Sequence, residues 1–60
     1  MTYSQAIAKL PADAALSCTF GYPGVGGYAE YHRDAAGNRY VIANGRWDDP
    51  VKVWTFEREG

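Results

Sequence analysis

The stretch YAEYHRDAAGNRYVIA, residues 28–43, predicts a β-hairpin and with it the fold of the chain. Two runs rich in aromatic and β-branched residues flank a short polar segment, and such runs are typical of strands. Asp34 favours the start of a type I turn, and Gly37 can take the left-handed conformation that closes a bulged three-residue loop. We therefore expect two antiparallel strands in which Asp34 pairs with Asn38.

This pairing decides which side chains share a face of the sheet. It places His32 opposite Tyr40 and Glu30 opposite Ile42, and these four residues share one face with Tyr28. The other face carries two alanines among larger residues: Ala29, Tyr31, Arg33, Arg39, Val41 and Ala43. Because the alanines would let a helix approach closely, we expect the helix on this second face and the first, aromatic face uncovered. A slip of one residue would exchange the two faces.

The rest of the chain predicts one helix before the hairpin and two further strands. Thr2 and Gln5 fit a capping box that begins a helix, apolar residues then recur at helical spacing, and Pro11 should end the helix at the residue before it. Alternating apolar and polar residues predict strands over 15–20 and 51–56. The fold class is therefore α+β, with one N-terminal helix packed on a three- to four-stranded antiparallel meander. We expect a single small domain over all 60 residues.

Composition argues against several classes of function. Cys18 is the only cysteine and His32 the only histidine, so we expect no internal disulfide, no metal site and no cofactor. Six basic residues nearly balance seven acidic ones, which disfavours direct nucleic-acid binding. No apolar run approaches the ~20 residues of a membrane span, and no secretory signal is recognisable. Together with the lone cysteine, this predicts a location in the cytoplasm of a host cell.

The glycine-rich stretch GYPGVGGY, residues 21–28, has the glycine spacing of a phosphate-binding loop. Gly27 and Tyr28 stand where that motif needs lysine and serine or threonine. A strand rather than a helix is expected to follow, so the helix terminus that would hold the anion is missing. We interpret the stretch as a hairpin loop whose glycines supply positive φ angles.

Two combinations of residues could suggest catalysis. Cys18, His32 and Asp34 are the residue types of a cysteine-protease triad, but the alternation of Cys18 with apolar residues predicts a buried thiol that acts as a small apolar group. Glu30 with Asp48 could form an acid–base pair, but so small a chain rarely encloses a pocket that tunes a carboxylate. We therefore predict no catalytic residues and no enzyme activity.

The predicted binding residues are aromatic and acidic. Tryptophan and tyrosine contribute strongly to protein interfaces, and the most concentrated acidic segment of the chain follows a tryptophan. Tyrosines on a sheet are also typical of single-stranded RNA binders, but such platforms need a positive surround. The predicted partner-binding residues are Tyr28, Glu30, His32, Tyr40, Trp47, Asp48 and Asp49.

A short helix followed by the aromatic-rich segments FGYPGVGGYAEYH, RYVIANGRW and VKVWTF, with no catalytic motif, resembles the small anti-CRISPR proteins of phages and mobile elements. The resemblance covers the whole chain and implies stoichiometric inhibition of a type I interference complex. The protein would bind a Cascade subunit and block recruitment of DNA or nuclease, as a monomer or weak homodimer. The alternatives are a small nucleic-acid-associated protein and, third, a minimal enzyme.

Overall fold

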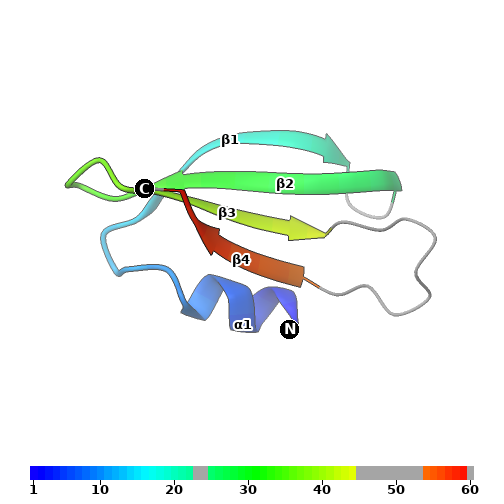
Figure 1. Cartoon of the computed structure of the whole chain (residues 1–60), viewed down its shortest axis with the longest axis horizontal. Helices are drawn as coiled ribbons and strands as arrows, with labels where there is room; N and C mark the ends of the chain where they lie inside the picture. Colours follow the sequence, from blue (N-terminus) through cyan, green and yellow to red (C-terminus); the bar gives the residue numbers. More distant parts are fainter. Residues whose placement is uncertain (23–24, 45–53, 60) are drawn as a thin grey trace.

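The computed structural model describes residues 1–22, 25–44 and 54–59 and has an α+β fold (Figure 1). Its elements, in chain order, are α1 (Tyr3–Ala8), β1 (Ala15–Tyr22), β2 (Val25–Arg33), β3 (Arg39–Asn44) and β4 (Trp54–Arg58). The strands form one antiparallel sheet in the order β1-β2-β3-β4. The predicted helix followed by an antiparallel meander is confirmed.

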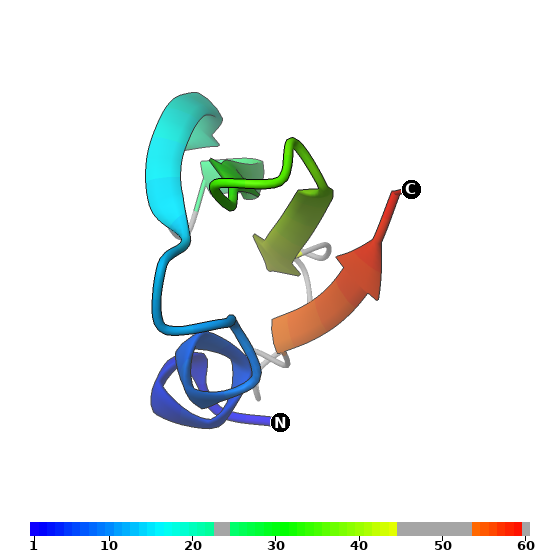
Figure 2. The same ribbon diagram turned by 90° about the vertical axis from the view of Figure 1, so that its left-hand side faces the viewer.

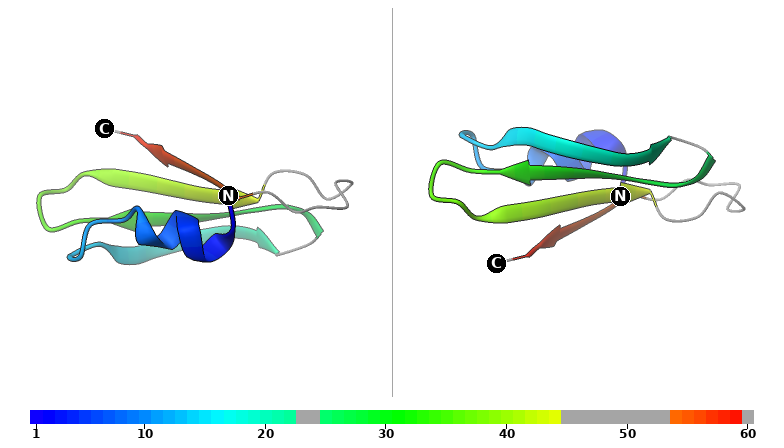
Figure 3. Two further views of the ribbon diagram at one scale, coloured as in Figure 1. Left: turned by 90° about the horizontal axis from the view of Figure 1, so that it is seen from below. Right: turned by 90° about the horizontal axis from the view of Figure 1, so that it is seen from above.

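The sheet is strongly curved, and α1 lies on its concave side. Seen end-on, the four strands form an arc, and α1 lies across the open side of that arc (Figure 2). Views from below and above show α1 running along the strands on one side only (Figure 3). In the described parts of the chain, no helix has the length and apolarity that a membrane span requires.

The helix begins as its capping residues predict. The Thr2 hydroxyl accepts a hydrogen bond from the Gln5 backbone N–H at 3.1 Å, and the Thr2 N–H donates to the Gln5 side chain at 2.8 Å. The helix ends at Ala8, two residues earlier than expected. A tighter turn follows it, in which the Leu10 N–H donates to the Ile7 carbonyl at 3.0 Å.

The hairpin of β2 and β3 has the predicted register, with His32 opposite Tyr40 and Ala29 opposite Ala43. The Asp34 N–H donates to the Asn38 carbonyl at 3.1 Å, and Gly37 has a φ of 88°. The Asp34 carboxylate accepts hydrogen bonds from two loop N–H groups, from the Asn38 amide and from the Tyr40 hydroxyl. These bonds explain why the local sequence specifies this turn.

The hairpin of β1 and β2 extends farther into the glycine-rich stretch than expected. Gly21 and Gly27 have φ angles of 83° and 104°, so the predicted positive φ values are confirmed at both. A Cβ atom at Gly21 would lie 2.3 Å from the Gly27 carbonyl oxygen, so close pairing of the two strands also needs glycine. The last strand, expected over 51–56, is observed as β4, and residues 51–53 lie outside the described residues.

The predicted position of the helix is wrong, because α1 covers the face that carries Glu30, Tyr40 and Ile42. The Tyr3 hydroxyl of α1 donates to the Glu30 carboxylate, and Ala6 of α1 is fully buried with Ile42. The prediction depended on Ala29 and Ala43, whose small side chains would let a helix approach closely. A curved sheet instead leaves a deep space on its concave side, which large side chains fill.

Cys18 was predicted to be buried, and this is also wrong: its side chain is exposed. The strand pairing is irregular between Leu16 and Cys18, so Leu16 lies opposite His32 whereas Cys18 lies opposite Tyr31. His32 and Tyr31 are neighbours in β2 and point to opposite faces. The irregularity at Ser17 therefore moves the Cys18 side chain to the face away from α1.

Candidate functional site

The sheet brings four of the predicted binding residues together, but beneath α1. Glu30, His32 and Tyr40 are each only 8% exposed, and Tyr28 is half-buried. Their assignment as partner contacts depended on an uncovered face, and that premise is wrong. The other three predicted contacts lie outside the described residues: Trp47, Asp48 and Asp49.

Glu30 is the centre of a polar cluster on this covered face. Its carboxylate accepts hydrogen bonds from the Tyr3 hydroxyl at 2.9 and 3.0 Å and from the Tyr28 hydroxyl at 2.6 Å. The His32 Nε2 lies 3.1 Å from one Glu30 oxygen. A buried carboxylate is stable only with such partners. The cluster therefore ties α1 to β2 through one charged group.

The hydrogen bonds also set the protonation states in this cluster. Burial by itself raises the pKa of Glu30, but the hydrogen bonds from Tyr28, His32 and Tyr3 lower it further than burial raises it. The bond to Glu30, with burial adding to it, raises the pKa of Tyr28 to about 12. At neutral pH Glu30 is therefore ionised and Tyr28 is protonated, and neither group changes its protonation state near pH 7. Such groups suit a structural cluster better than they suit proton transfer near pH 7.

Aromatic side chains close the rest of the covered face. Trp54 meets the ring of Tyr3 edge-on at 4.7 Å and that of Tyr28 at 5.8 Å, and Tyr40 stacks on Phe56 at 5.8 Å. The sequence analysis missed Tyr3 and Trp54 as partners of the Glu30 cluster. Tyr3 stands in the apolar stripe of the helix, so its pattern predicts contact with the sheet but does not say which face it meets.

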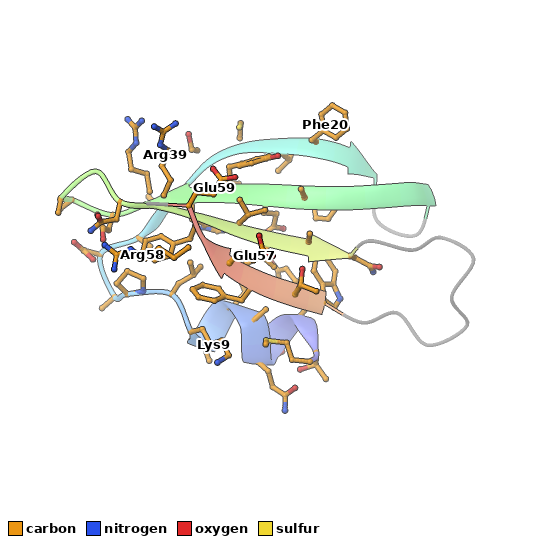
Figure 4. All side chains as sticks on the ribbon, in the orientation of Figure 1. Lys9, Phe20, Arg39, Glu57, Arg58 and Glu59 are labelled. Atoms are coloured by element: carbon orange, nitrogen blue, oxygen red, sulfur yellow. The ribbon has the colours of Figure 1, made fainter. Side chains whose placement is uncertain are left out.

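The opposite, convex face carries Phe20, the most exposed large apolar side chain of the described residues. We call it the open face and define it by the side chains that alternate with the covered ones: Cys18, Phe20, Ala29, Tyr31, Arg33, Arg39, Val41 and Ala43. Phe20 is 75% exposed, and Figure 4 shows Phe20 and Arg39 projecting away from α1. Half-buried apolar side chains of β2 and β3 lie on the same face as Phe20, so part of the open face is apolar.

One end of the open face is a shallow hollow of about 230 Å³, lined among others by Cys18, Tyr31, Arg33, Arg39 and Glu59. Arg33 and Arg39 are directly paired across β2 and β3, and both are exposed. Two guanidinium groups held side by side can bind a carboxylate through paired hydrogen bonds. Glu59 brings a compensating negative charge to the rim of the same hollow.

The structure does not assemble the triad considered from the sequence. The Cys18 thiol lies on the open face, whereas the His32 ring lies on the covered face against Glu30. The Asp34 carboxylate is taken up by the hairpin loop and Tyr40.

Comparisons of the chain with protein-family models, curated proteins and solved structures found no match.

Proposed function

We propose that this chain is a non-enzymatic protein-binding module whose contact surface is the open face. The single observation that carries the proposal is the exposure of Phe20 in the middle of β1, beside apolar side chains of β2. Burying an exposed aromatic side chain is a large favourable contribution to an interface. The surface differs from the predicted one, because the Tyr28 face is occupied by α1.

The side chains of the open face also indicate which kind of partner surface would be complementary to it. An apolar patch on the partner would cover Phe20 and Tyr31, and acidic side chains would lie against Arg33 and Arg39. Trp47, Asp48 and Asp49 remain a second candidate surface, proposed from their sequence alone. The double variant Asp48→Lys with Asp49→Lys tests that surface separately.

The experiment is affinity capture from a host lysate with four versions of the chain. Phe20→Ser removes the apolar contact, and Arg33→Glu with Arg39→Glu reverses the charge of the hollow. Lys9→Ala changes an exposed residue at the end of α1, on the other side of the sheet, and serves as the control (Figure 4). We expect a protein that the wild type and Lys9→Ala retain and the open-face variants lose. If all four versions retained that protein equally, the result would contradict the proposed surface.

A narrower form of the proposal follows the resemblance to anti-CRISPR proteins, namely stoichiometric inhibition of a type I interference complex. It is supported by the whole-chain likeness in helix placement and aromatic strands. Titration of the protein into purified Cascade, followed by DNA binding and nuclease recruitment, tests it directly. Inhibition that saturates near one or two copies per complex is expected. Unchanged DNA binding and recruitment would end the narrower form and leave the binding module to the capture experiment.

Two further measurements separate the alternatives. A nucleic-acid-associated protein would bind DNA or RNA with an affinity that falls steeply as salt rises. An enzyme that used Cys18 would lose its effect in Cys18→Ala while the fold stayed intact.

A further inference from the structure

We propose that two copies of this chain associate through antiparallel pairing of their β1 strands, so that two four-stranded sheets join into one. The inference goes beyond the proposed function, because it concerns the edge of the sheet rather than the open face. It is based on a difference between the two edge strands, β1 and β4.

The β1 edge lacks most of the features that normally protect an edge strand. Natural edge strands are short, charged, interrupted by proline, bulged or covered, because free backbone groups pair with other chains. Of these features β1 has one, the irregular pairing with β2 next to Ser17 and at Gly21. The β1 sequence ALSCTFGY runs for eight residues without charge or proline. In the described part of the chain, no segment lies along its outer side (Figure 1). Leu16 and Phe20 add exposed apolar surface, at 56% and 75%.

The β4 edge is protected in three ways. The strand has five residues, and two of them are the charged Glu57 and Arg58. Its first residue is already paired with the N-terminus: the Trp54 N–H donates to the Met1 carbonyl at 2.9 Å, and the Met1 amino group donates to the Trp54 carbonyl at 3.2 Å. The chain therefore blocks one edge and leaves the other available.

A second copy fits the β1 edge better than a charged segment does. In a two-fold antiparallel pair, each residue of β1 faces a residue of the same strand. Because β1 has no charged residue, such a pair opposes no like charges, which would otherwise destabilise it. Phe20 on the open face and Leu16 on the other face would then each gain the second copy's β1 as a neighbouring strand. Arg33 lies on β2, so β1 separates its strand from the second copy.

The small core gives a reason for association. Among the described residues, the buried apolar side chains are those of Ala6, Tyr40 and Ile42, and Ile42 is the largest that is completely enclosed. A 60-residue domain buries only about 60% of the surface of its unfolded chain, and such domains often gain stability from a partner subunit. A copy of the same chain is always present to supply that burial.

Sedimentation equilibrium of the full chain, under reducing conditions that keep Cys18 a thiol, tests the proposal. From micromolar to several hundred micromolar protein, we expect the mass to rise from 6.6 kDa to twice that value. Thr19→Lys places a charge on exposed β1 and should weaken the dimer at least about tenfold. Thr55→Lys makes the same change at an exposed threonine of β4 and should leave the dimer unchanged.

Hydrogen exchange of the wild type provides a readout that needs no variant. We expect the β1 amides to become more protected as protein concentration rises, and the β4 amides to stay unchanged. A monomer mass at every concentration would overturn the proposal and leave the β1 edge to another protein. A dimer that Thr55→Lys weakens and Thr19→Lys does not, or one that protects β4, would overturn it as well.

Discussion

The two faces of the sheet differ in where their side chains find partners. In β3, Tyr40, Ile42 and Asn44 are buried, whereas the residues that alternate with them are half-buried or, at Arg39, exposed. On the covered face, Glu30 and the aromatic rings are held by contacts within the chain. On the open face, Phe20 projects into solvent. The comparison indicates that the covered face holds the fold together, whereas the open face makes fewer contacts within the chain.

The largest expected effect is that of truncating a buried side chain of β3. Ile42→Ala empties the largest enclosed side-chain site of the described core and should cost about 2–5 kcal/mol of the free energy of unfolding. Val41→Ala removes an apolar side chain from the next position, on the open face, and should cost less than about 1 kcal/mol. Urea denaturation followed by fluorescence measures both. Equal losses would show that the faces are equally packed and would break the comparison.

The second largest expected effect is that of removing the buried carboxylate of Glu30. Glu30→Ala leaves the hydroxyls of Tyr3 and Tyr28 without their acceptor and should cost about 2–3 kcal/mol. Glu57→Ala removes an exposed carboxylate from β4 and should stay within about 0.5 kcal/mol. The same denaturation measurement applies. A neutral Glu30→Ala would mean that the cluster adds little to the attachment of α1.

The register of the central hairpin could be predicted because its causes are local. Asp34 and Gly37 specify the loop through hydrogen bonds and a positive φ that few other residues would support, and the pairing of β2 with β3 follows. The capping box at Thr2 is local in the same way. These features depend on residues within five positions of each other, so the sequence pattern alone contains them.

The covered face and the accessibility of Cys18 could not be predicted in the same way. Which face α1 covers depends on the curvature of the whole sheet and on contacts such as Tyr3 with Glu30, which are 27 residues apart. The position of Cys18 depends on an irregular pairing at Ser17, where no glycine or proline gives a signal. The candidate surface therefore lies on the face opposite to the predicted one. The predicted grouping of the β2 and β3 residues by face is nevertheless correct.

A change of pH tests the covered face with a smaller expected effect, because a protonated Glu30 can still form hydrogen bonds. The pKa of Glu30 is lowered by folding, so its contribution to stability is complete above its ordinary value of 4.5 and is lost as the pH falls through the lower, folded value. The pKa of Tyr28 is raised to about 12, so its contribution is complete below 10 and is lost as the pH rises through 12.

Denaturation midpoints measured from acid to alkaline pH should therefore show a plateau that falls on both sides. Glu30→Gln should reduce the acid fall, and the part due to Asp34, whose pKa is lowered chiefly by its bonds to Asn38, should remain. Tyr28→Phe should reduce the alkaline fall. An acid fall of the same size in Glu30→Gln would assign it entirely to other carboxylates.

The smallest expected effect on stability is that of Phe20→Ser, and its size decides whether the open face is free. Phe20 is 75% exposed, so the free energy of unfolding should change by less than about 0.5 kcal/mol. Phe56→Ser replaces the same residue type on the covered face, where its ring stacks on Tyr40, and should cost more than about 1 kcal/mol. Both are measured at low micromolar protein, so that association does not contribute. If Phe20→Ser destabilises the monomer as much as Phe56→Ser does, the Phe20 ring is already packed within one chain, and the open face is not the surface that binds a partner.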